Sequence, residues 1–292
     1  MSVALFRVRL ADDSARWAAG DARPERLLAA DASLERLLGG RADLATAVAS
    51  AAEPAPADAG LLAPIGSQEV WAAGVTYLRS REARGEEATD RSPYDLVYDA
   101  ERPELFFKAP GRRVVGPGEP IGIRADSTWD VPEPELVLVL DADLRVVAHT
   151  IGNDVSSRSL EGENPLYLQQ AKTYERSCAI GPALVSASEA TPPFTIRLVV
   201  GRDGRTAFEG ETSTAEMKRS FEELAAHLGR ALAFPEGVFL FTGTGIVPDA
   251  SFTLQPGDVV RVEVEGLGML ENPVVRVGTA SGPPRIEREV TT

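Results

Sequence analysis

The most constraining feature of this sequence is a pair of glutamates, one residue apart, at the start of an apolar run. Glu133 and Glu135 lie in the segment Trp129–Leu140, which ends Leu-Val-Leu-Val-Leu like a buried strand. Residues two apart on a strand point to the same side, so both carboxylates would meet one site, about 6 to 7 Å apart. Burying two like charges is costly unless a cation or strong donors compensate them. A hard divalent metal ion satisfies this condition; two solvent-facing residues on an edge strand are the alternative.

Composition places the chain among ordinary globular proteins. Its 292 residues are 43% hydrophobic and 25% charged, which suits one large domain with a small one beside it. The first residues lack the pattern of a signal peptide and no apolar run could span a bilayer, so we expect a cytoplasmic protein. A formal charge of −14 argues against nucleic acid or an anionic membrane as a partner. The single cysteine, Cys178, excludes an internal disulfide and a cysteine-cluster metal site.

The apolar patterns predict an α+β fold that is mainly β. Residues 4–9 alternate like a strand, residues 34–48 favour a short helical stretch, and an Ala/Pro-rich connector follows. We therefore place a small N-terminal α/β domain with its connector at residues 1–65 and a larger domain at residues 66–292. Strand-like runs dominate the larger domain, and they lie at residues 105–107, 136–140, 146–151, 194–200, 238–242, 259–264 and 274–277.

Two further segments of the larger domain have distinct patterns. A helix is predicted at Ser213–Phe234, because Ser213-Thr-Ala-Glu216 fits a capping box and Pro235 would stop the helix. Residues 77–102 are dense in charge with weak apolar periodicity, so we interpret them as a surface helix or a mobile lid.

A third carboxylate is expected beside the first two. Asp154 follows the strand that comes after the turn Asp141-Ala-Asp143, so a hairpin would return it to Glu133 and Glu135. Three carboxylates, with positions left for water and substrate, suit Mg²⁺ or Mn²⁺, and no His/Cys cluster is present for zinc.

Other polar residues have weaker signals. Lys172 lies among apolar and amide residues, where it would approach the metal and a substrate oxygen; a solvated surface lysine is the commoner explanation of such a residue. The motif Thr242-Gly-Thr-Gly245 ends a strand, and its glycines would let backbone donors approach a ligand, unless it is a plain tight turn. Neither His149 nor His227 has a catalytic context, and no Gly-x-Ser-x-Gly elbow is present, so covalent nucleophilic catalysis is not expected.

The order of the motifs resembles the fumarylacetoacetate hydrolase superfamily over residues 70–278. The resemblance rests on Gly74-Val-Thr-Tyr, Pro103-Glu-Leu-Phe-Phe-Lys108, Glu133-Pro-Glu-Leu, Asn153-Asp-Val-Ser-Ser-Arg, Lys172, Gly181-Pro, Thr242-Gly-Thr-Gly and Leu270-Glu-Asn-Pro273. It implies a mixed β-sandwich roll of the fumarylacetoacetate hydrolase type, preceded by a small N-terminal α/β domain. It also implies a homodimer or homotetramer.

The resemblance also implies roles for single residues. The metal ligands would be Glu133, Glu135 and Asp154, with Mg²⁺ as the cofactor and Mn²⁺ or Ca²⁺ as substitutes. Lys172 would be the active-site lysine, and Thr244 would hold a substrate carboxylate or oxo group. The motifs Arg-Pro-Glu-Leu-Phe-Phe-Lys and Glu-Asn-Pro-Leu-Tyr-Leu are most similar to the 2-keto-3-deoxy-D-arabinonate dehydratase branch. That similarity implies a place beside the metal for Glu104.

The function expected from this resemblance is the dehydration of a 2-oxo-3-deoxy sugar acid. A 2-keto-3-deoxypentonate would give 2,5-dioxopentanoate through an enolate held by the metal. Lys172 would stabilise the enolate or supply a proton, and Glu104 would act as the base at C3 or the acid at the leaving hydroxyl. Thr244 and Arg81 would hold the substrate's carboxylate and hydroxyl groups; Arg81 is chosen because the lid must offset a strongly acidic surface. Ser156 and Arg158 would orient Asp154 without binding the metal themselves.

Two alternative functions are open from the sequence. One is a C–C hydrolase or decarboxylase of an acylpyruvate or oxaloacetate-type 2-oxo acid, which would need a base at Glu82, Glu86 or Glu87 in the lid. The hydrolases of the superfamily use a histidine and a glutamate there, whereas residues 77–84 contain no histidine. The other is a non-catalytic protein that binds metal and oxo acids without turnover.

Overall fold

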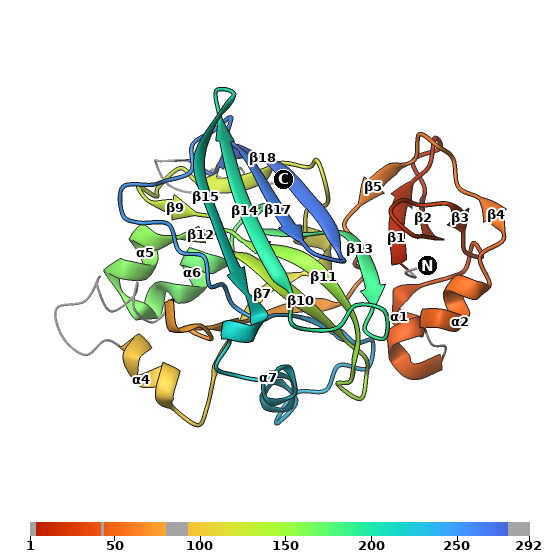
Figure 1. The fold of residues 1–292 in the computed structure, drawn as a ribbon, viewed down its shortest axis with the longest axis horizontal. Helices are drawn as coiled ribbons and strands as arrows, with labels where there is room; N and C mark the ends of the chain where they lie inside the picture. The colour runs from red at the N-terminus through yellow and green to blue at the C-terminus, as the bar shows by residue number, and fades with distance from the viewer. Residues whose placement is uncertain (1–3, 42–43, 80–92, 280–292) are drawn as a thin grey trace, which may run out of the picture.

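Two β-sheets form the body of the protein, with a smaller group of strands and helices at one side (Figure 1). The computed structural model describes residues 4–41, 44–79 and 93–279. In this part of the chain the larger sheet has eleven strands: β1 (Ala4–Arg9), β2 (Ala15–Gly20), β3 (Arg26–Leu27), β4 (Glu53–Pro54), β5 (Gly60–Leu62), β6 (Glu69–Gly74), β7 (Glu104–Pro110), β10 (Pro134–Leu140), β11 (Val146–Asp154), β13 (Cys178–Ser186) and β16 (Val238–Phe241). Their order is β4-β3-β2-β1-β13-β11-β10-β16-β6-β7, with β5 paired to β1.

A second sheet of five strands lies over part of the first (Figure 1). In the order of the sheet, its strands are β15 (Arg205–Ser213), β14 (Thr195–Arg202), β17 (Val259–Val264), β18 (Gly268–Val277) and β8 (Ile121–Arg124). A short ladder joins β9 (Asp130–Val131) and β12 (Ser156–Ser157). The described helices and helical turns are α1 (Leu34–Arg36), η1 (Leu37–Arg41), α2 (Leu44–Ala49), α4 (Pro93–Asp99), η2 (Gly111–Arg113), α5 (Arg158–Glu163), η3 (Pro165–Tyr167), α6 (Leu168–Lys172), η4 (Thr214–Glu216) and α7 (Phe221–Leu228).

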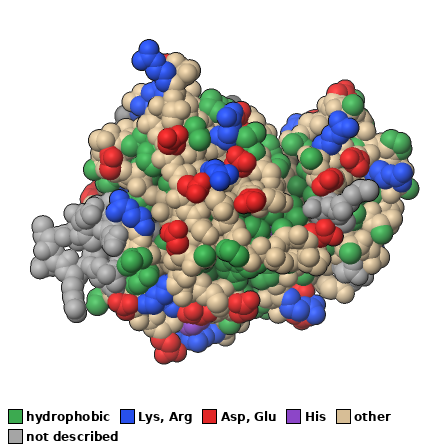
Figure 2. Space-filling view, viewed as in Figure 1, with side chains coloured by type: hydrophobic (Ala, Val, Ile, Leu, Met, Phe, Trp, Pro, Cys, Tyr) green, Lys and Arg blue, Asp and Glu red, His purple; other side chains and the backbone are tan. Residues whose placement is uncertain are grey.

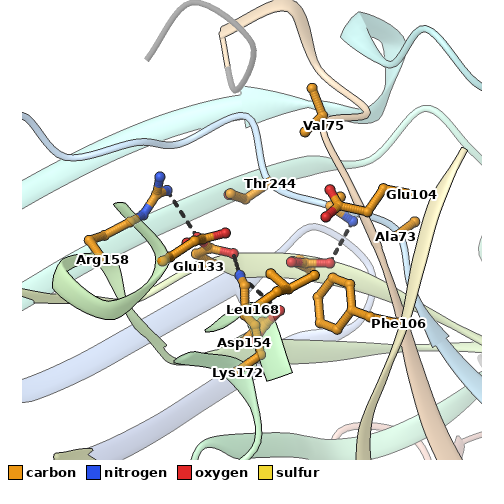
Figure 3. Close-up of a pocket in the computed structure, with 14 residues that line it drawn as sticks. Ala73, Val75, Glu104, Phe106, Glu133, Asp154, Arg158, Leu168, Lys172 and Thr244 are labelled. Atoms are coloured by element: carbon orange, nitrogen blue, oxygen red, sulfur yellow. Dashed lines mark hydrogen bonds and ion pairs between the residues drawn. The ribbon is translucent and has the colours of Figure 1, made fainter. Parts of the chain in front are cut away.

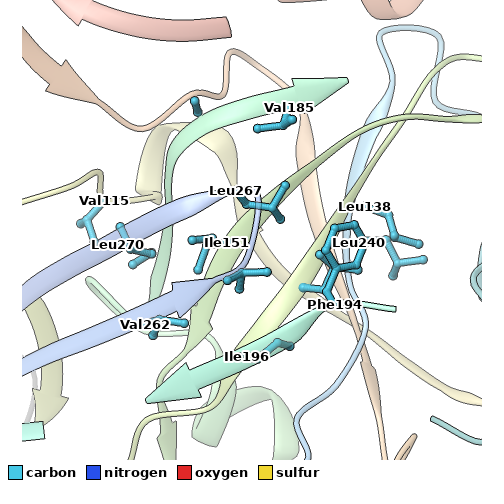
Figure 4. Packing of buried hydrophobic residues seen from close by; sticks show 14 of the residues in the cluster. Val115, Leu138, Ile151, Val185, Phe194, Ile196, Leu240, Val262, Leu267 and Leu270 are labelled. Carbon is cyan, nitrogen blue, oxygen red and sulfur yellow. The ribbon is translucent and has the colours of Figure 1, made fainter. Parts of the chain in front are cut away.

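Strand β10 is buried on both faces, which explains its continuous apolar run. Leu136, Leu138 and Leu140 belong to the core between the two sheets, together with residues of β14, β17 and β18 (Figure 4). Val137 and Val139 point the other way and join the core that includes the helices near the N-terminus. Because side chains alternate along a strand, the face of Val137 and Val139 also carries the residues two and four positions before Val137. Those residues are glutamates.

The expected fold class is confirmed: the chain is α+β, mainly β, with mixed sheets. Each predicted strand of the larger domain overlaps an observed one. At the N-terminus β1 pairs with β13 of the larger domain as well as with β2 and β5, and β5 lies in the segment expected to be a connector. The division at residues 1–65 and 66–292 stays a prediction. Within the described residues no helix is long and apolar enough to cross a membrane.

The helix predicted at Ser213–Phe234 is wrong in its bounds. Ser213 ends β15 and caps a single helical turn, and the helix α7 begins only after Ser220. The hydroxyl of Ser220 accepts a hydrogen bond from the amide of Glu223 at 3.1 Å, so the N-cap lies seven residues later than predicted. Two capping-box patterns follow each other in this stretch; Ser213 pairs with Thr195 of β14, and only the second pattern opens a longer helix. Met217, expected on the helix, forms a backbone bridge with Tyr77 instead.

Acidic and basic side chains are scattered over the face shown in Figure 2 and do not gather in one patch. One buried titratable group away from the sheet ends is His149 on β11, which is 3% exposed. Its ring lies 5.0 Å from that of Phe194 and 6.3 Å from that of Phe221. Burial lowers the pKa of His149 to about 4, although a backbone hydrogen bond with Ala190 opposes this shift.

This pKa predicts a loss of stability in acid. The unfolded chain binds a proton at a pKa of about 6.5 while the folded chain does not until about 4, so stability falls as pH drops between these values. We expect this imidazole to contribute about 3 kcal/mol to that loss. Urea unfolding from pH 7 to pH 4 should show a smaller loss for His149→Gln than for wild type. His227→Gln, at a less buried histidine whose pKa burial also lowers, should keep more of the wild-type loss than His149→Gln does. Equal losses in wild type and His149→Gln would contradict the prediction.

Candidate active site

Glu133 and Glu135 lie at the start of β10, an interior strand between β11 and β16. Their exposed fractions are 5% and 1%, so the alternative of solvent-facing residues on an edge strand is wrong. Both side chains line one pocket, as the two-residue spacing predicts. The amide of Gly243 donates a hydrogen bond to Oε2 of Glu135 at 2.5 Å.

Asp154 joins them by the expected hairpin. The carboxylate of Asp141 accepts hydrogen bonds from the amides of Asp143 and Arg145, which closes the turn between β10 and β11. The two strands then run antiparallel, and the amide of Asp154 donates to the carbonyl of Glu133 at 2.9 Å. One oxygen from each of the three carboxylates lies within 4.8 Å of the others.

The electrostatics of this cluster fit a divalent cation. Burial raises the pKa of Glu135 well above its usual range, and the charges of Asp154 and Glu133 raise it further; Lys172 and the Gly243 amide oppose the shift. Removal from water and mutual repulsion therefore disfavour three ionised carboxylates together. A small cation with hard oxygen ligands would relieve both effects, so the residues present could hold Mg²⁺ or a similar ion.

Lys172, at the end of α6, reaches into the same cluster (Figure 3). Its Nζ lies 2.6 Å from Oε2 of Glu133, 3.3 Å from Oδ2 of Asp154 and 2.7 Å from Oγ of Ser156. The side chain is 3% exposed, so the alternative of a solvated surface lysine is wrong. Ser156 also donates to the backbone carbonyl of Asp154 at 2.9 Å.

Arg158 was expected to orient Asp154, and this role stays a prediction; the structure places its guanidinium beside Glu133, another of the three clustered acids. Its Nη2 donates to Oε1 of Glu133 at 2.9 Å. Arg158 is the first residue of α5, which begins directly after β12. Glu133 thus has Lys172 on one oxygen and Arg158 on the other.

Glu104 enters the pocket from β7, on the side opposite Arg158 (Figure 3). It pairs in register with Gly74 of β6, and a Cβ at Gly74 would overlap the Glu104 carboxylate. A side chain at position 74 would therefore displace the Glu104 carboxylate from its present place. Phe106, two residues along β7, lines the same pocket.

The motif Thr242-Gly-Thr-Gly245 forms the remaining wall. Gly243 has φ +91°, a conformation that favours glycine, and a Cβ there would overlap the hydroxyl of Thr76. This conformation aims the Gly243 amide at Glu135, so a backbone donor of the motif serves an acidic residue of the protein. Thr244 is 5% exposed and lines the pocket.

Six of the seven predicted site residues therefore meet in one pocket; the seventh, Arg81, lies outside the described residues, as do residues 80–92 of the expected lid. Glu161, which no sequence motif singled out, also lines the pocket. Its position three residues after Arg158 on α5 puts both on one helix face, a signal visible only once the helix is known. Cys178 is buried, which raises its pKa to about 12, in keeping with the expectation that no cysteine nucleophile acts here.

Comparisons with known proteins match this chain to a family and to relatives. The family model described as fumarylacetoacetate (FAA) hydrolase C-terminal matches residues 69–275. A probable 2-keto-3-deoxyxylonate dehydratase of Haloferax volcanii is 48% identical over 75% of this chain and 76% of the relative. A 2-dehydro-3-deoxy-D-arabinonate dehydratase of Saccharolobus solfataricus is 44% identical over 74% of this chain and 75% of the relative.

Solved structures agree with the sequence relatives. A 2-keto-3-deoxy-D-arabinonate dehydratase in its apo form has a TM-score of 0.82 and 33% identity, covering 94% of this chain and 100% of that one. A structure of 2-keto-3-deoxy-D-arabinonate dehydratase complexed with magnesium and 2,5-dioxopentanoate has a TM-score of 0.73 and 33% identity, covering 94% and 99%.

Proposed function

Because the chain belongs to the fumarylacetoacetate hydrolase family, we propose that it catalyses the Mg²⁺-dependent dehydration of a 2-oxo-3-deoxy sugar acid. The substrate is a 2-keto-3-deoxypentonate and the product is 2,5-dioxopentanoate. One observation carries the proposal: a buried cluster of three carboxylates and a lysine occurs in a chain 48% and 44% identical to two dehydratases of such acids.

The proposed metal ligands are Glu133, Glu135 and Asp154. When bound, Mg²⁺ supplies Lewis acidity to the substrate's carbonyl oxygen and so makes the C3 proton more acidic. The formal charges of the described residues support a divalent ion: two further acids, Glu104 and Glu161, line the pocket, whereas Lys108, Arg158 and Lys172 are the cations at this cluster. The acids exceed the cations by two, which one divalent ion would balance.

Lys172 and Glu104 are the proposed catalytic residues. One carboxylate oxygen of Glu104 removes the C3 proton, and the ammonium group of Lys172 stabilises the negative charge that develops on the C2 oxygen. The C4–O bond then breaks, and the hydroxyl leaves as water with a proton from the site. A proton shift from C5 and tautomerisation give the aldehyde at C5, so the product is the substrate minus one water and no oxidant is needed.

Thr244 and Arg81 are the proposed substrate-binding residues. Thr244 is supported by its place on the pocket wall, and its hydroxyl suits a carboxylate or oxo oxygen. Arg81 rests on the sequence argument alone, because it lies outside the described residues. We further propose that the protein works in the cytoplasm as a homodimer or homotetramer.

Glu104→Gln should lower kcat by about 10²- to 10⁴-fold, because the amide can neither accept the C3 proton nor return it. Metal binding should persist, since Glu104 is not one of the three clustered ligands. Steady-state rates at saturating Mg²⁺ measure the first effect, and titration with Mn²⁺ measures the second. Glu101→Gln changes an exposed glutamate three residues away and should match wild type. Wild-type kcat in Glu104→Gln would remove this residue from the mechanism.

The products formed from two substrate classes test the function itself. Purified protein with Mg²⁺ would be incubated with 2-keto-3-deoxypentonates and, separately, with acylpyruvates, and the products measured by mass. We expect loss of one water from a pentonate and no cleavage of acylpyruvates. Hydrolysis of a C–C bond of the acylpyruvate, which gives two smaller products, would instead establish the hydrolase function. Binding of Mg²⁺ and oxo acids with no turnover of either class would leave the non-catalytic alternative.

A further inference from the structure

Lys108 is a buried lysine beside the pocket that none of the proposed steps uses. Its side chain is 0% exposed, and it is absent from the described residues that line the pocket. It lies on β7, two residues beyond Phe106, where the pairing with β6 passes from Phe107 to Ala109 and leaves Lys108 as the extra residue of a β-bulge. A buried ammonium group is costly unless its charge and its donors are compensated, so the partners of Lys108 indicate its role.

Three oxygen acceptors surround Nζ of Lys108. It donates to the carbonyl oxygen of Lys172 at 2.5 Å and to that of Val155 at 3.2 Å, and it forms an ion pair with Oδ1 of Asp154. Two of the three ammonium donors are therefore hydrogen-bonded, and the charge is paired with that of Asp154. Lys108 is held by three oxygen atoms of the protein, and any influence on a ligand must pass through these partners.

These acceptors belong to the two segments that supply the site. Asp154 is the last residue of β11 and Val155 follows it directly, and Lys172 is the last residue of α6. A second contact reinforces the junction, because Oγ1 of Thr173 donates to the carbonyl of Lys108 at 3.2 Å. Strand β7, the end of β11 and the end of α6 are thus joined at one side chain.

The contact with Asp154 also limits how its carboxylate can rotate. Lys108 holds Oδ1, while Oδ2 lies 3.3 Å from Nζ of Lys172. Two cations on opposite oxygens define one orientation of the carboxylate, and loss of the first would leave a buried oxygen without its charge partner. Metal affinity is sensitive to contacts of this kind because they fix the ligand before the ion arrives.

We propose that Lys108 is a positioning residue that fixes the carboxylate of Asp154 and the main chain at Lys172 relative to each other. Metal affinity and turnover then both depend on a side chain that touches neither metal nor substrate. The inference rests on the proposed function, since it takes Asp154 as a metal ligand and Lys172 as a catalytic residue.

The test compares Lys108→Met with wild type in the full chain, using Mn²⁺ as the probe for metal binding. We expect the Kd for Mn²⁺ to rise about 10- to 100-fold. With a 2-keto-3-deoxypentonate at saturating metal, kcat should fall by about tenfold or more while KM changes by less than about threefold, because the substrate contacts are unaltered. Lys218→Met is the matched control: this partly exposed lysine pairs with Asp99, and its removal should leave both constants unchanged.

Each outcome has one meaning. A stable or destabilised Lys108→Met protein that binds Mn²⁺ and turns over as wild type does would overturn the inference and leave Lys108 with a role in folding only. Failure of wild type itself to bind Mn²⁺ would instead overturn the proposed function. Should the Met variant not fold, Lys108→Arg provides the test. Its guanidinium group keeps the charge, but its N–H donors are spread over a planar group and cannot replace a single ammonium nitrogen among these acceptors. Wild-type Kd and kcat in the Arg variant would then also overturn it.

Discussion

Glu135→Gln should reduce metal-dependent turnover by about 10²- to 10³-fold or more without unfolding the protein. The reason is that the substitution removes a charged oxygen ligand from the proposed metal site, and a bound metal ion contributes several kcal/mol to stabilising the developing charge. Rates measured over a range of Mg²⁺ concentrations check this expectation. Glu209→Gln, on the exposed part of β15, is the matched control and should behave as wild type. Unchanged activity of Glu135→Gln with metal would refute the ligand assignment.

The same substitution should stabilise the metal-free protein at neutral pH. Burial raises the pKa of Glu135 above its unfolded value, so the folded state holds this proton more tightly than the unfolded state does. The associated stability is present at low pH and is lost as pH rises from the unfolded to the folded pKa. Glutamine cannot ionise, so this loss should be absent. Melting temperatures in EDTA, measured from pH 4 to pH 8, should fall less for Glu135→Gln than for wild type; parallel curves would contradict the argument.

Lys172→Met should lower kcat by about 10²- to 10⁴-fold at saturating Mg²⁺, because it removes the ammonium group proposed to stabilise charge on the C2 oxygen. It should also destabilise the metal-free protein by about 3 to 5 kcal/mol, since Glu133 and Asp154 lose a buried partner. Added Mg²⁺ should recover much of that stability by supplying a cation.

Steady-state rate assays measure the loss of kcat, and urea unfolding with and without Mg²⁺ measures the loss of stability. Lys218→Met again serves as the control because it removes a lysine from a partly exposed ion pair. A Lys172→Met protein with wild-type kcat would exclude the lysine from catalysis. A loss of kcat with no change in metal-free stability would show that the ion pairs with Glu133 and Asp154 contribute little to folding.

Much of the acidic cluster could be predicted from local spacing. The two-residue interval between Glu133 and Glu135 determines that they share a strand face, and the Asp141 turn determines that β11 returns antiparallel to β10. Each of these relations is set by neighbouring residues, so a single sequence contains them. The apolar residues after Glu135 indicated burial, although burial on both faces of β10 became clear only from the packing of two sheets.

Other features depend on contacts between distant segments, which spacing does not determine. Lys108 touches Asp154 and Lys172 across 46 and 64 positions, and nothing near it in the sequence signals an acidic partner. Arg158 reaches Glu133 across 25 positions, and Ser213 is held at the end of β15 by pairing with β14, so α7 begins only after Ser220. The position of Arg81 is still a prediction from the sequence.

The most direct test of the proposed function is the reaction of 2-keto-3-deoxy-D-arabinonate with the purified protein, followed by proton NMR in parallel samples with Mg²⁺ and with EDTA. We predict an aldehyde signal with Mg²⁺, together with the mass of 2,5-dioxopentanoate in a mass spectrum of the same sample, and unchanged substrate with EDTA. Persistence of the substrate in both samples, under conditions where the protein binds Mg²⁺ and is folded, would contradict the proposed function for this pentonate.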